Sequence, residues 1–163
     1  MNGQVDYLAP LGESHFLVGS TQGQVCIYNN QTQTLSKQLD TGGLSIYEMA
    51  YTAKGKRLAV GCDEGLINIY DLDAHDRVGQ VKAQQSDITS LLYVTHDRLV
   101  VGQVEGYIDV IKFTGTKAII THSLQINEAG DINHLSLASK PLELMIACQK
   151  GLLLCNITKN ETL

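Results

Sequence analysis

The side chains in this sequence that could act as nucleophiles or metal ligands are scattered rather than grouped. Nucleophilic catalysis needs a thiol or hydroxyl beside a base and an orienting group, and zinc needs three or four ligands. The chain has four cysteines without a C-x-x-C pair, and Cys62 and Cys148 each end a short apolar run. Five histidines are dispersed, and the pair His122 and His134 lacks a third ligand. We therefore expect buried, inert thiols and assign no catalytic residue, no cofactor and no metal.

The elements that carry these residues follow one template that occurs four times. In each copy a short apolar run ends in a small residue, and a glycine follows four residues later. The copies are LVGSTQGQVCIYN (Leu17 to Asn29), VGCDEGLINIYD (Val60 to Asp71), VVGQVEGYIDVIK (Val100 to Lys112) and MIACQKGLLLCN (Met145 to Asn156). Their glycines are 42, 41 and 45 residues apart, at Gly23, Gly65, Gly106 and Gly151. A period of about 40 to 45 residues made of short strands is typical of β-propeller blades.

The repeated glycine predicts a hairpin between the second and third strands of each blade. A tight turn needs a residue that tolerates positive φ, which glycine adopts without steric cost. The flanking runs are rich in β-branched and aromatic residues, as in strands buried between neighbouring sheets. A first strand precedes each hairpin and a last strand follows it, except in the fourth blade. We predict an all-β fold, one segment over residues 1–163, with four-stranded blades at about 5–39, 46–82, 88–124 and 132–157.

The hairpin strands resemble those of the Trp-Asp (WD) repeat family. The last two residues of INIYD (Ile67 to Asp71) stand where that family carries Trp-Asp, and Glu64 and Glu105 stand at the family's turn aspartate. The chain has no tryptophan, and Gln84-Gln85 replaces the Gly-His dipeptide, so the family's His-Ser-Trp-Asp hydrogen-bond network is not expected. The resemblance implies a noncatalytic platform for other proteins.

The stretch DTGG, Asp40 to Gly43, is similar to the active-site signature of aspartic proteases. That signature requires a second catalytic aspartate in a double-domain barrel, whereas this stretch falls in the connection between the first and second blades. We interpret it as a loop. The alternative to a scaffold is a propeller-based enzyme or small-molecule binder with its site in a central channel.

Four blades predict an incomplete ring. A WD-type propeller needs roughly 300 residues at this period, and the chain has 163. Each blade buries its apolar face only against the next one, so an arc leaves two sheet faces uncovered. Three interpretations remain open: a half-propeller completed by a second copy or another subunit, a fragment of a longer polypeptide, and a closed four-bladed ring. The ring is the least favoured, because the four residues before the first strand are too few to supply the missing strand.

The overall charge narrows the class of partner. The formal net charge is -5 and the pI is about 5.4, which disfavours nucleic acid and anionic membranes, since both attract basic surfaces. The sequence contains no apolar run as long as a membrane span, and its polar start lacks the features of a signal peptide. These features predict a cytoplasmic protein that binds another protein.

The turns between second and third strands and the connections between blades open on one face of a propeller. Acidic residues dominate the segments expected there, so we predict an acidic face that binds a basic peptide or a basic patch of a neighbouring protein. The predicted protein-binding residues are Asp63, Glu64, Asp87, Glu105, Asp131, Tyr47 and Tyr107. An open alternative is that exposed turns carry acidic residues only for solubility.

Overall fold

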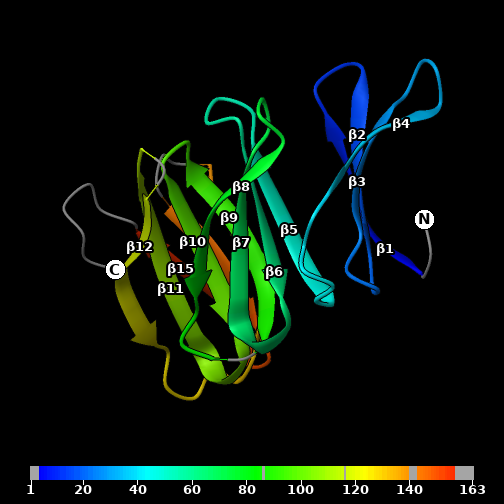
Figure 1. Ribbon diagram of the computed structural model, residues 1–163. Helices are drawn as coiled ribbons and strands as arrows, with labels where there is room; N and C mark the ends of the chain where they lie inside the picture. The colour runs from blue at the N-terminus through cyan, green and yellow to red at the C-terminus, as the bar shows by residue number, and fades with distance from the viewer. Residues whose placement is uncertain (1–3, 86, 116, 140–142, 157–163) are drawn as a thin grey trace.

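Four antiparallel sheets follow one another along the chain in the computed structural model, which describes residues 4–85, 87–115, 117–139 and 143–156 (Figure 1). Blade 1 contains β1 (Val5–Leu11), β2 (His15–Ser20), β3 (Val25–Asn29) and β4 (Thr34–Leu39). Blade 2 contains β5 (Ile46–Thr52), β6 (Arg57–Cys62), β7 (Leu66–Asp71) and β8 (Asp76–Lys82). Blade 3 contains β9 (Ile88–Thr95), β10 (Arg98–Gln103), β11 (Tyr107–Thr114) and β12 (Lys117–Gln125). Blade 4 contains β13 (Ile132–Leu137), β14 (Glu143–Cys148) and β15 (Gly151–Asn156).

The predicted all-β fold class is confirmed. Within each blade the strands pair in sequence order as an antiparallel meander. The helical elements among the described residues are two single 3₁₀ turns, Asp63–Gly65 and Val104–Gly106. No helix in the described part of the chain is long and apolar enough to span a membrane. Over the described residues blade 4 has three strands, and residue 157, the last of the predicted blade, lies outside the described residues.

The central strands are apolar on both faces because each lies between two sheets. In β6, Leu58 and Val60 face blade 1 and Ala59 faces blade 3, and all three side chains are fully buried. Such strands are continuous apolar runs rather than alternating ones. The three resulting cores join blade 1 to blade 2, blade 2 to blade 3, and blade 3 to blade 4. No core cluster of described residues joins blade 1 to blade 4, so the sheets form an open arc (Figure 1).

The hairpin turns of blades 2 and 3 share one geometry. Glu64 has φ 58° and Gly65 has φ 70°, while Glu105 and Gly106 have φ 56° and 77°. Two successive positive φ values are the condition of a type I′ turn, whose twist matches that of the strands. The predicted glycine therefore takes the second of the two strained positions, and a glutamate takes the first.

The fourth hairpin corrects the prediction that Gly151 is a turn residue. The last pair before this turn is Cys148 opposite Gly151, so two residues, Gln149 and Lys150, form the turn. In blade 2 three residues separate the corresponding pair of Cys62 and Leu66. Because the fourth turn is one residue shorter, Gly151 becomes the first residue of β15, with φ 144°.

One backbone hydrogen bond recurs in all four blades. The residue after the second strand donates its N–H to the carbonyl of the residue before the first strand, at 3.0 to 3.3 Å. The pairs are Thr21 with Gln4, Asp63 with Ser45, Val104 with Asp87, and Gln149 with Asp131. This bond brings the connection between blades against the hairpin turn, so the predicted binding residues of both segments lie at the same end of the sheets.

Candidate functional site

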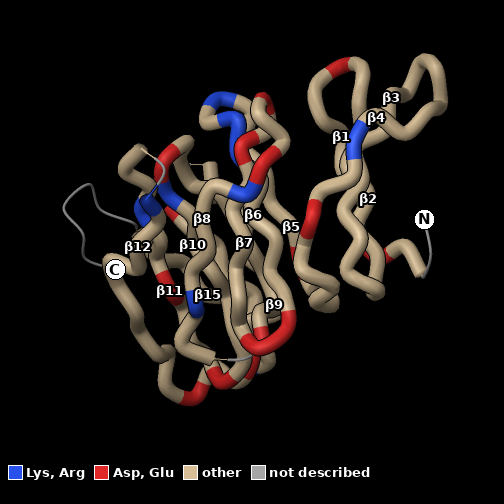
Figure 2. Tube along the Cα trace, viewed as in Figure 1, with Lys and Arg blue, Asp and Glu red and all other residues tan. Residues whose placement is uncertain are grey.

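Acidic residues gather at one end of the arc, as Figure 2 shows at the lower end of the sheets. This is the end that carries the β6–β7 and β10–β11 turns, whereas lysines and arginines mix with acids at the other end (Figure 2). We define the acidic rim as the seven predicted binding residues: Asp63, Glu64, Asp87, Glu105, Asp131, Tyr47 and Tyr107. The structure places all seven in or beside hairpin turns and connections between blades. The carboxylates of Asp63 and Asp131 are bound within the fold, whereas those of the other three acids are exposed.

Asp63 and Tyr47 form the centre of the rim. The Asp63 carboxylate accepts hydrogen bonds from the Tyr47 hydroxyl and from the Ser45 N–H, the latter at 3.1 Å. The Tyr47 hydrogen bond, with the Ser45 contact, lowers the pKa of Asp63. The same bond to Asp63, followed by burial and the negative charges of Asp63 and Asp87, raises the pKa of Tyr47. Tyr47 is 53% exposed, so its ring is presented to solvent beside two carboxylates.

The Asp131 carboxylate links the turns of blades 3 and 4. Its Oδ1 accepts the backbone N–H of Glu105 at 2.9 Å, and its Oδ2 accepts Nε2 of Gln149 at 2.9 Å. Glu105 belongs to the turn of blade 3, and Gln149 belongs to the turn of blade 4. The Asp131 carboxylate therefore has a structural role that the sequence prediction did not assign to it.

The remaining acids of the rim are exposed at its surface. Glu64, Asp87 and Glu105 all have exposed side chains, while Tyr107 is half-buried at the start of β11. Lys82 lies at the margin, where its ammonium group donates to the backbone carbonyl of Glu64 rather than to the carboxylate. Three carboxylates on neighbouring turns are thus presented at one end of the arc, next to the Tyr47 ring.

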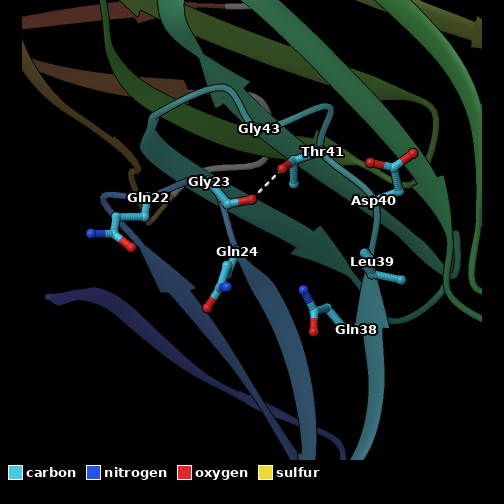
Figure 3. Close-up of a pocket in the computed structure, with 8 residues that line it drawn as sticks. All are labelled: Gln22, Gly23, Gln24, Gln38, Leu39, Asp40, Thr41 and Gly43. Atoms are coloured by element: carbon cyan, nitrogen blue, oxygen red, sulfur yellow. Dashed lines mark hydrogen bonds between the residues drawn. The ribbon is translucent and has the colours of Figure 1, made fainter. Parts of the chain in front are cut away.

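A polar pocket of about 440 Å³ lies at the same end, between the turn of blade 1 and the connection to blade 2 (Figure 3). It is lined by Gln22, Gly23, Gln24, Gln38, Leu39, Asp40, Thr41 and Gly43. The Thr41 hydroxyl donates to the carbonyl of Gly23, and Asp40 accepts the Gly42 N–H at 2.9 Å. The DTGG stretch is therefore a loop, as interpreted, with its aspartate folded onto its own turn. The lining offers amide, hydroxyl and carboxylate groups for hydrogen bonding.

The cysteines lie inside the fold. Cys26, Cys62 and Cys148 are buried, as predicted, and Cys155 is half-buried. Burial raises the pKa of the Cys62 thiol to about 11, so the thiol stays protonated at neutral pH. Among the described residues no group of three or more His, Cys, Asp or Glu side chains could hold a metal ion.

A buried polar cluster in blade 3 was missed by the sequence prediction. Asp109 is fully buried, and its carboxyl group accepts hydrogen bonds from the Gln84 N–H and from Nε2 of Gln103, both at 2.9 Å, and from the Ser123 hydroxyl. The Gln103 side chain in turn accepts the Gln85 N–H at 2.6 Å. These bonds anchor the Gln84-Gln85 connection, where the family resemblance had suggested that a network would be missing.

The repeated sequence pattern contains a signal for this cluster, a polar residue at the same position of two apolar strands. Asp109 interrupts an apolar strand at the position that Asn68 occupies in blade 2, and both side chains are fully buried. Their cross-strand partners are Ser123 and Gln80, and Gln80 donates to the Asn68 side-chain oxygen at 2.9 Å. Tyr70, at the position of the family's tryptophan, is fully buried, and its hydroxyl donates to the Asp40 carbonyl at 2.6 Å.

Comparison with known families agrees with this architecture. The model of the "Anaphase-promoting complex subunit 4 WD40 domain" family matches residues 16–97, half of the chain. The chain belongs to the WD40-repeat family. The resemblance seen in the hairpin strands is thereby confirmed, and WD40 membership supports a general role as a platform for protein interaction.

Two WD40 relatives match part of the chain. U3 small nucleolar RNA-associated protein 4 of Schizosaccharomyces pombe is 32% identical over 94 residues, which are 55% of this chain and 13% of that protein. The WD repeat-containing protein 91 homolog of Dictyostelium discoideum is 28% identical over 75 residues, 46% of this chain and 10% of that protein. The chain thus matches only a small share of the length of these curated relatives.

Two solved structures share the fold. The computationally designed Ika4 protein superposes with a TM-score of 0.80 at 15% identity, covering 97% of this WD40 chain and 94% of its own. The computationally designed Ika8 protein superposes with a TM-score of 0.79 at 14% identity, covering 96% of this chain but 47% of its own. The fold of this chain therefore corresponds to nearly all of one designed protein and to about half of another.

Proposed function

We propose that this WD40 chain is a noncatalytic interaction module whose acidic rim binds a basic segment of another protein. The observation that carries the proposal is the exposed Tyr47 ring, which lies at the Asp63 carboxylate and in the field of the negative charge of Asp87. A lysine or arginine of the partner would stack on this ring and pair with the carboxylates. Cation–π contacts and charge-assisted hydrogen bonds both favour that arrangement.

The exposed charges support recognition of a basic partner. Glu64, Asp87 and Glu105 have exposed side chains, so they can pair with a partner without first breaking a buried contact. Negative charge on neighbouring turns raises the rate of encounter with a basic segment and orients it, and it contributes less to the final affinity. The polar pocket beside the rim offers amide groups for the backbone of an extended peptide.

A protein partner is favoured over nucleic acid. One relative is named for its association with U3 small nucleolar RNA, but an acidic rim repels phosphates, and the whole chain carries a formal charge of -5. The cytoplasmic location expected from the sequence remains a proposal.

Fluorescence anisotropy with a labelled Gly-Lys-Arg repeat peptide tests this function, with a Gly-Glu repeat peptide as the reference ligand. We expect the basic peptide to bind more tightly, and the difference to shrink as salt screens the charges. The double variant Asp87→Asn/Glu105→Gln should weaken binding roughly 5- to 10-fold. The matched control is Glu13→Gln/Asp76→Asn, which removes two exposed charges from the opposite end. Equal affinity for both peptides, or equal loss in both double variants, would refute the proposal.

A further inference from the structure

Each of the three interfaces between blades uses the same small residue as a socket. The penultimate residue of the second strand is Gly19, Gly61 or Gly102, and a Cβ placed there would lie 2.8 Å from Met49, 3.1 Å from Ile88 or 2.6 Å from Ile132. These three large residues all belong to the first strand of the next blade. Only a small residue leaves room for that side chain, so the socket is a requirement of blade packing.

The side chains that fill the sockets occupy two repeated positions of the first strand. One position lies opposite the last residue of the second strand, and the other lies three residues later. The buried residues at these positions are Ile46 and Met49 in blade 2, Ile88 and Leu91 in blade 3, and Ile132 and Leu135 in blade 4, and none is more than 7% exposed. The preceding blade covers each pair.

Blade 1 carries the same pair, and no blade in the described part of the chain covers it. Val5 lies opposite Ser20 and Leu8 lies opposite Val18, which are the same two register positions. Val5 is 52% exposed and Leu8 is 67% exposed. Behind them, Phe16 and Tyr28 stack with ring centroids 5.4 Å apart and line an open cavity of about 590 Å³. The first end of the arc therefore presents the apolar side chains that enter a socket.

The corresponding position of blade 4 has no occupant among the residues that the structure describes. Ala147 is the penultimate residue of β14 and pairs with Leu152 across the hairpin. Its methyl group takes up space that the three glycines leave open, so a side chain packed on it would lie further out than in the glycine sockets. Ile146 and Cys148 face blade 3, so Ala147 and Leu152 face away from it. Leu152 is 65% exposed, and Leu154 on the same face is 62% exposed. The exposed face of blade 4 is therefore complementary to the exposed face of blade 1, and not to a second copy of the blade 4 face.

We propose that two copies of this chain close a ring head to tail, with blade 1 of each copy packed on blade 4 of the other. A socket at one end and its occupants at the other make the contact heterologous, and two such contacts close when the combined arcs complete the ring. The likeness to Ika8 supports two copies per ring, because this chain superposes on 47% of a longer chain of the same fold. The inference rests on the end faces of the arc and is independent of the acidic rim.

Sedimentation equilibrium of the 163-residue chain tests the closure. We expect a particle of twice 17.8 kDa. Leu8→Glu removes an occupant and Ala147→Phe fills the socket, and both positions lie on uncovered faces, so each variant should keep its strand signal by circular dichroism. Each should raise the dissociation constant of the pair roughly 10-fold or more. Ile119→Glu is the matched control, because Ile119 is 54% exposed on β12, away from both end faces.

Mixing the two variants distinguishes a head-to-tail ring from other pairs. A mixture of Leu8→Glu with Ala147→Phe regains one intact contact, between the unchanged Leu8 of one copy and the unchanged Ala147 of the other. We therefore expect the mixture to associate more tightly than either variant alone. A folded monomer, an open series of larger oligomers or an aggregate would overturn the proposal. So would a pair that only Leu8→Glu disrupts, because blade 1 would then contact blade 1.

Discussion

Ser45 and Asp63 hold each other through two reciprocal hydrogen bonds. The Asp63 N–H donates to the Ser45 carbonyl at 3.1 Å, and the Ser45 N–H donates to Asp63 Oδ2 at 3.1 Å. The pair joins the connection before β5 to the turn after β6, and Tyr47 adds its hydroxyl to the same carboxylate. The binding surface proposed for the rim therefore depends on a local structural clamp.

The clamp predicts a pH dependence of stability. Hydrogen bonds from Tyr47 and Ser45 hold the pKa of Asp63 below its usual value of about 3.9. A lowered folded-state pKa stabilises the fold above the unfolded-state pKa, and this contribution is lost as the pH falls through the folded-state pKa. We expect Asp63→Asn to show a smaller loss of stability than the wild type between about pH 5 and pH 3, measured by urea unfolding. Asp76→Asn is the control at the opposite end, and an unchanged slope for Asp63→Asn would contradict the assignment.

Reversal of the turn charges should weaken peptide binding without unfolding the chain. Glu64 and Glu105 have exposed side chains at matched positions of two hairpins. The double variant Glu64→Lys/Glu105→Lys keeps side chains of similar length at the same φ, so the melting temperature should change little. Binding of the basic peptide should fall by roughly 10-fold or more. Unchanged binding of a partner by this variant would remove the acidic rim from the proposed function.

The same two turns should be stabilised by asparagine. Glu64 and Glu105 adopt φ of 58° and 56°, a region that costs an ordinary side chain roughly 1 kcal/mol and that asparagine tolerates better. We expect Glu64→Asn and Glu105→Asn each to raise the free energy of unfolding by about 0.5 kcal/mol. Chemical denaturation measures the change. Glu13→Asn removes the same charge from a residue outside the positive-φ set and should not reproduce the gain.

Gly23 should tolerate no side chain. It has φ +73°, and a Cβ there would lie 2.3 Å from the Leu44 carbonyl oxygen, so both the conformation and the space exclude alanine. We expect Gly23→Ala to destabilise the fold by about 2 kcal/mol or more. Gly42→Ala separates the two effects, because Gly42 has φ +75° with nothing within 4 Å of its Cβ. That control should cost only about 1 kcal/mol, and equal losses at both sites would show that the contact with Leu44 is unimportant.

The buried Asp109 cluster should be sensitive to the loss of its acceptor oxygens. Asp109→Ala would leave the Gln84 N–H and the Gln103 amide without their acceptor, at a cost of about 2 to 4 kcal/mol. Asp109→Asn retains one acceptor oxygen, and asparagine is the native residue at the matching position 68 of blade 2. Thermal unfolding should therefore rank the wild type first, Asp109→Asn second and Asp109→Ala last. Equal stability of the two variants would contradict the proposed hydrogen bonding.

The number, order and local geometry of the strands follow from the amino-acid sequence. Strand formation and tight turns depend on neighbouring residues, so the apolar runs around Gly23, Gly65 and Gly106 were sufficient to place the first three hairpins. The fourth was wrong in detail, because a turn shorter by one residue moves Gly151 into β15 without changing the sequence pattern.

Which side chains of the rim are structural and which face solvent depends on the packing of the folded chain. The hydrogen-bond partners of Asp63, Asp131 and Asp109 lie 18 to 26 residues away in the sequence. They are Ser45, Glu105 and Gln84, respectively. The composition of the turns predicted an acidic end, because polar residues are favoured in turns. Asp131 pairs with Glu105 and Gln149, and Val5 and Leu8 are exposed, because of how neighbouring sheets stack. A local sequence pattern does not contain the distances between residues of different sheets.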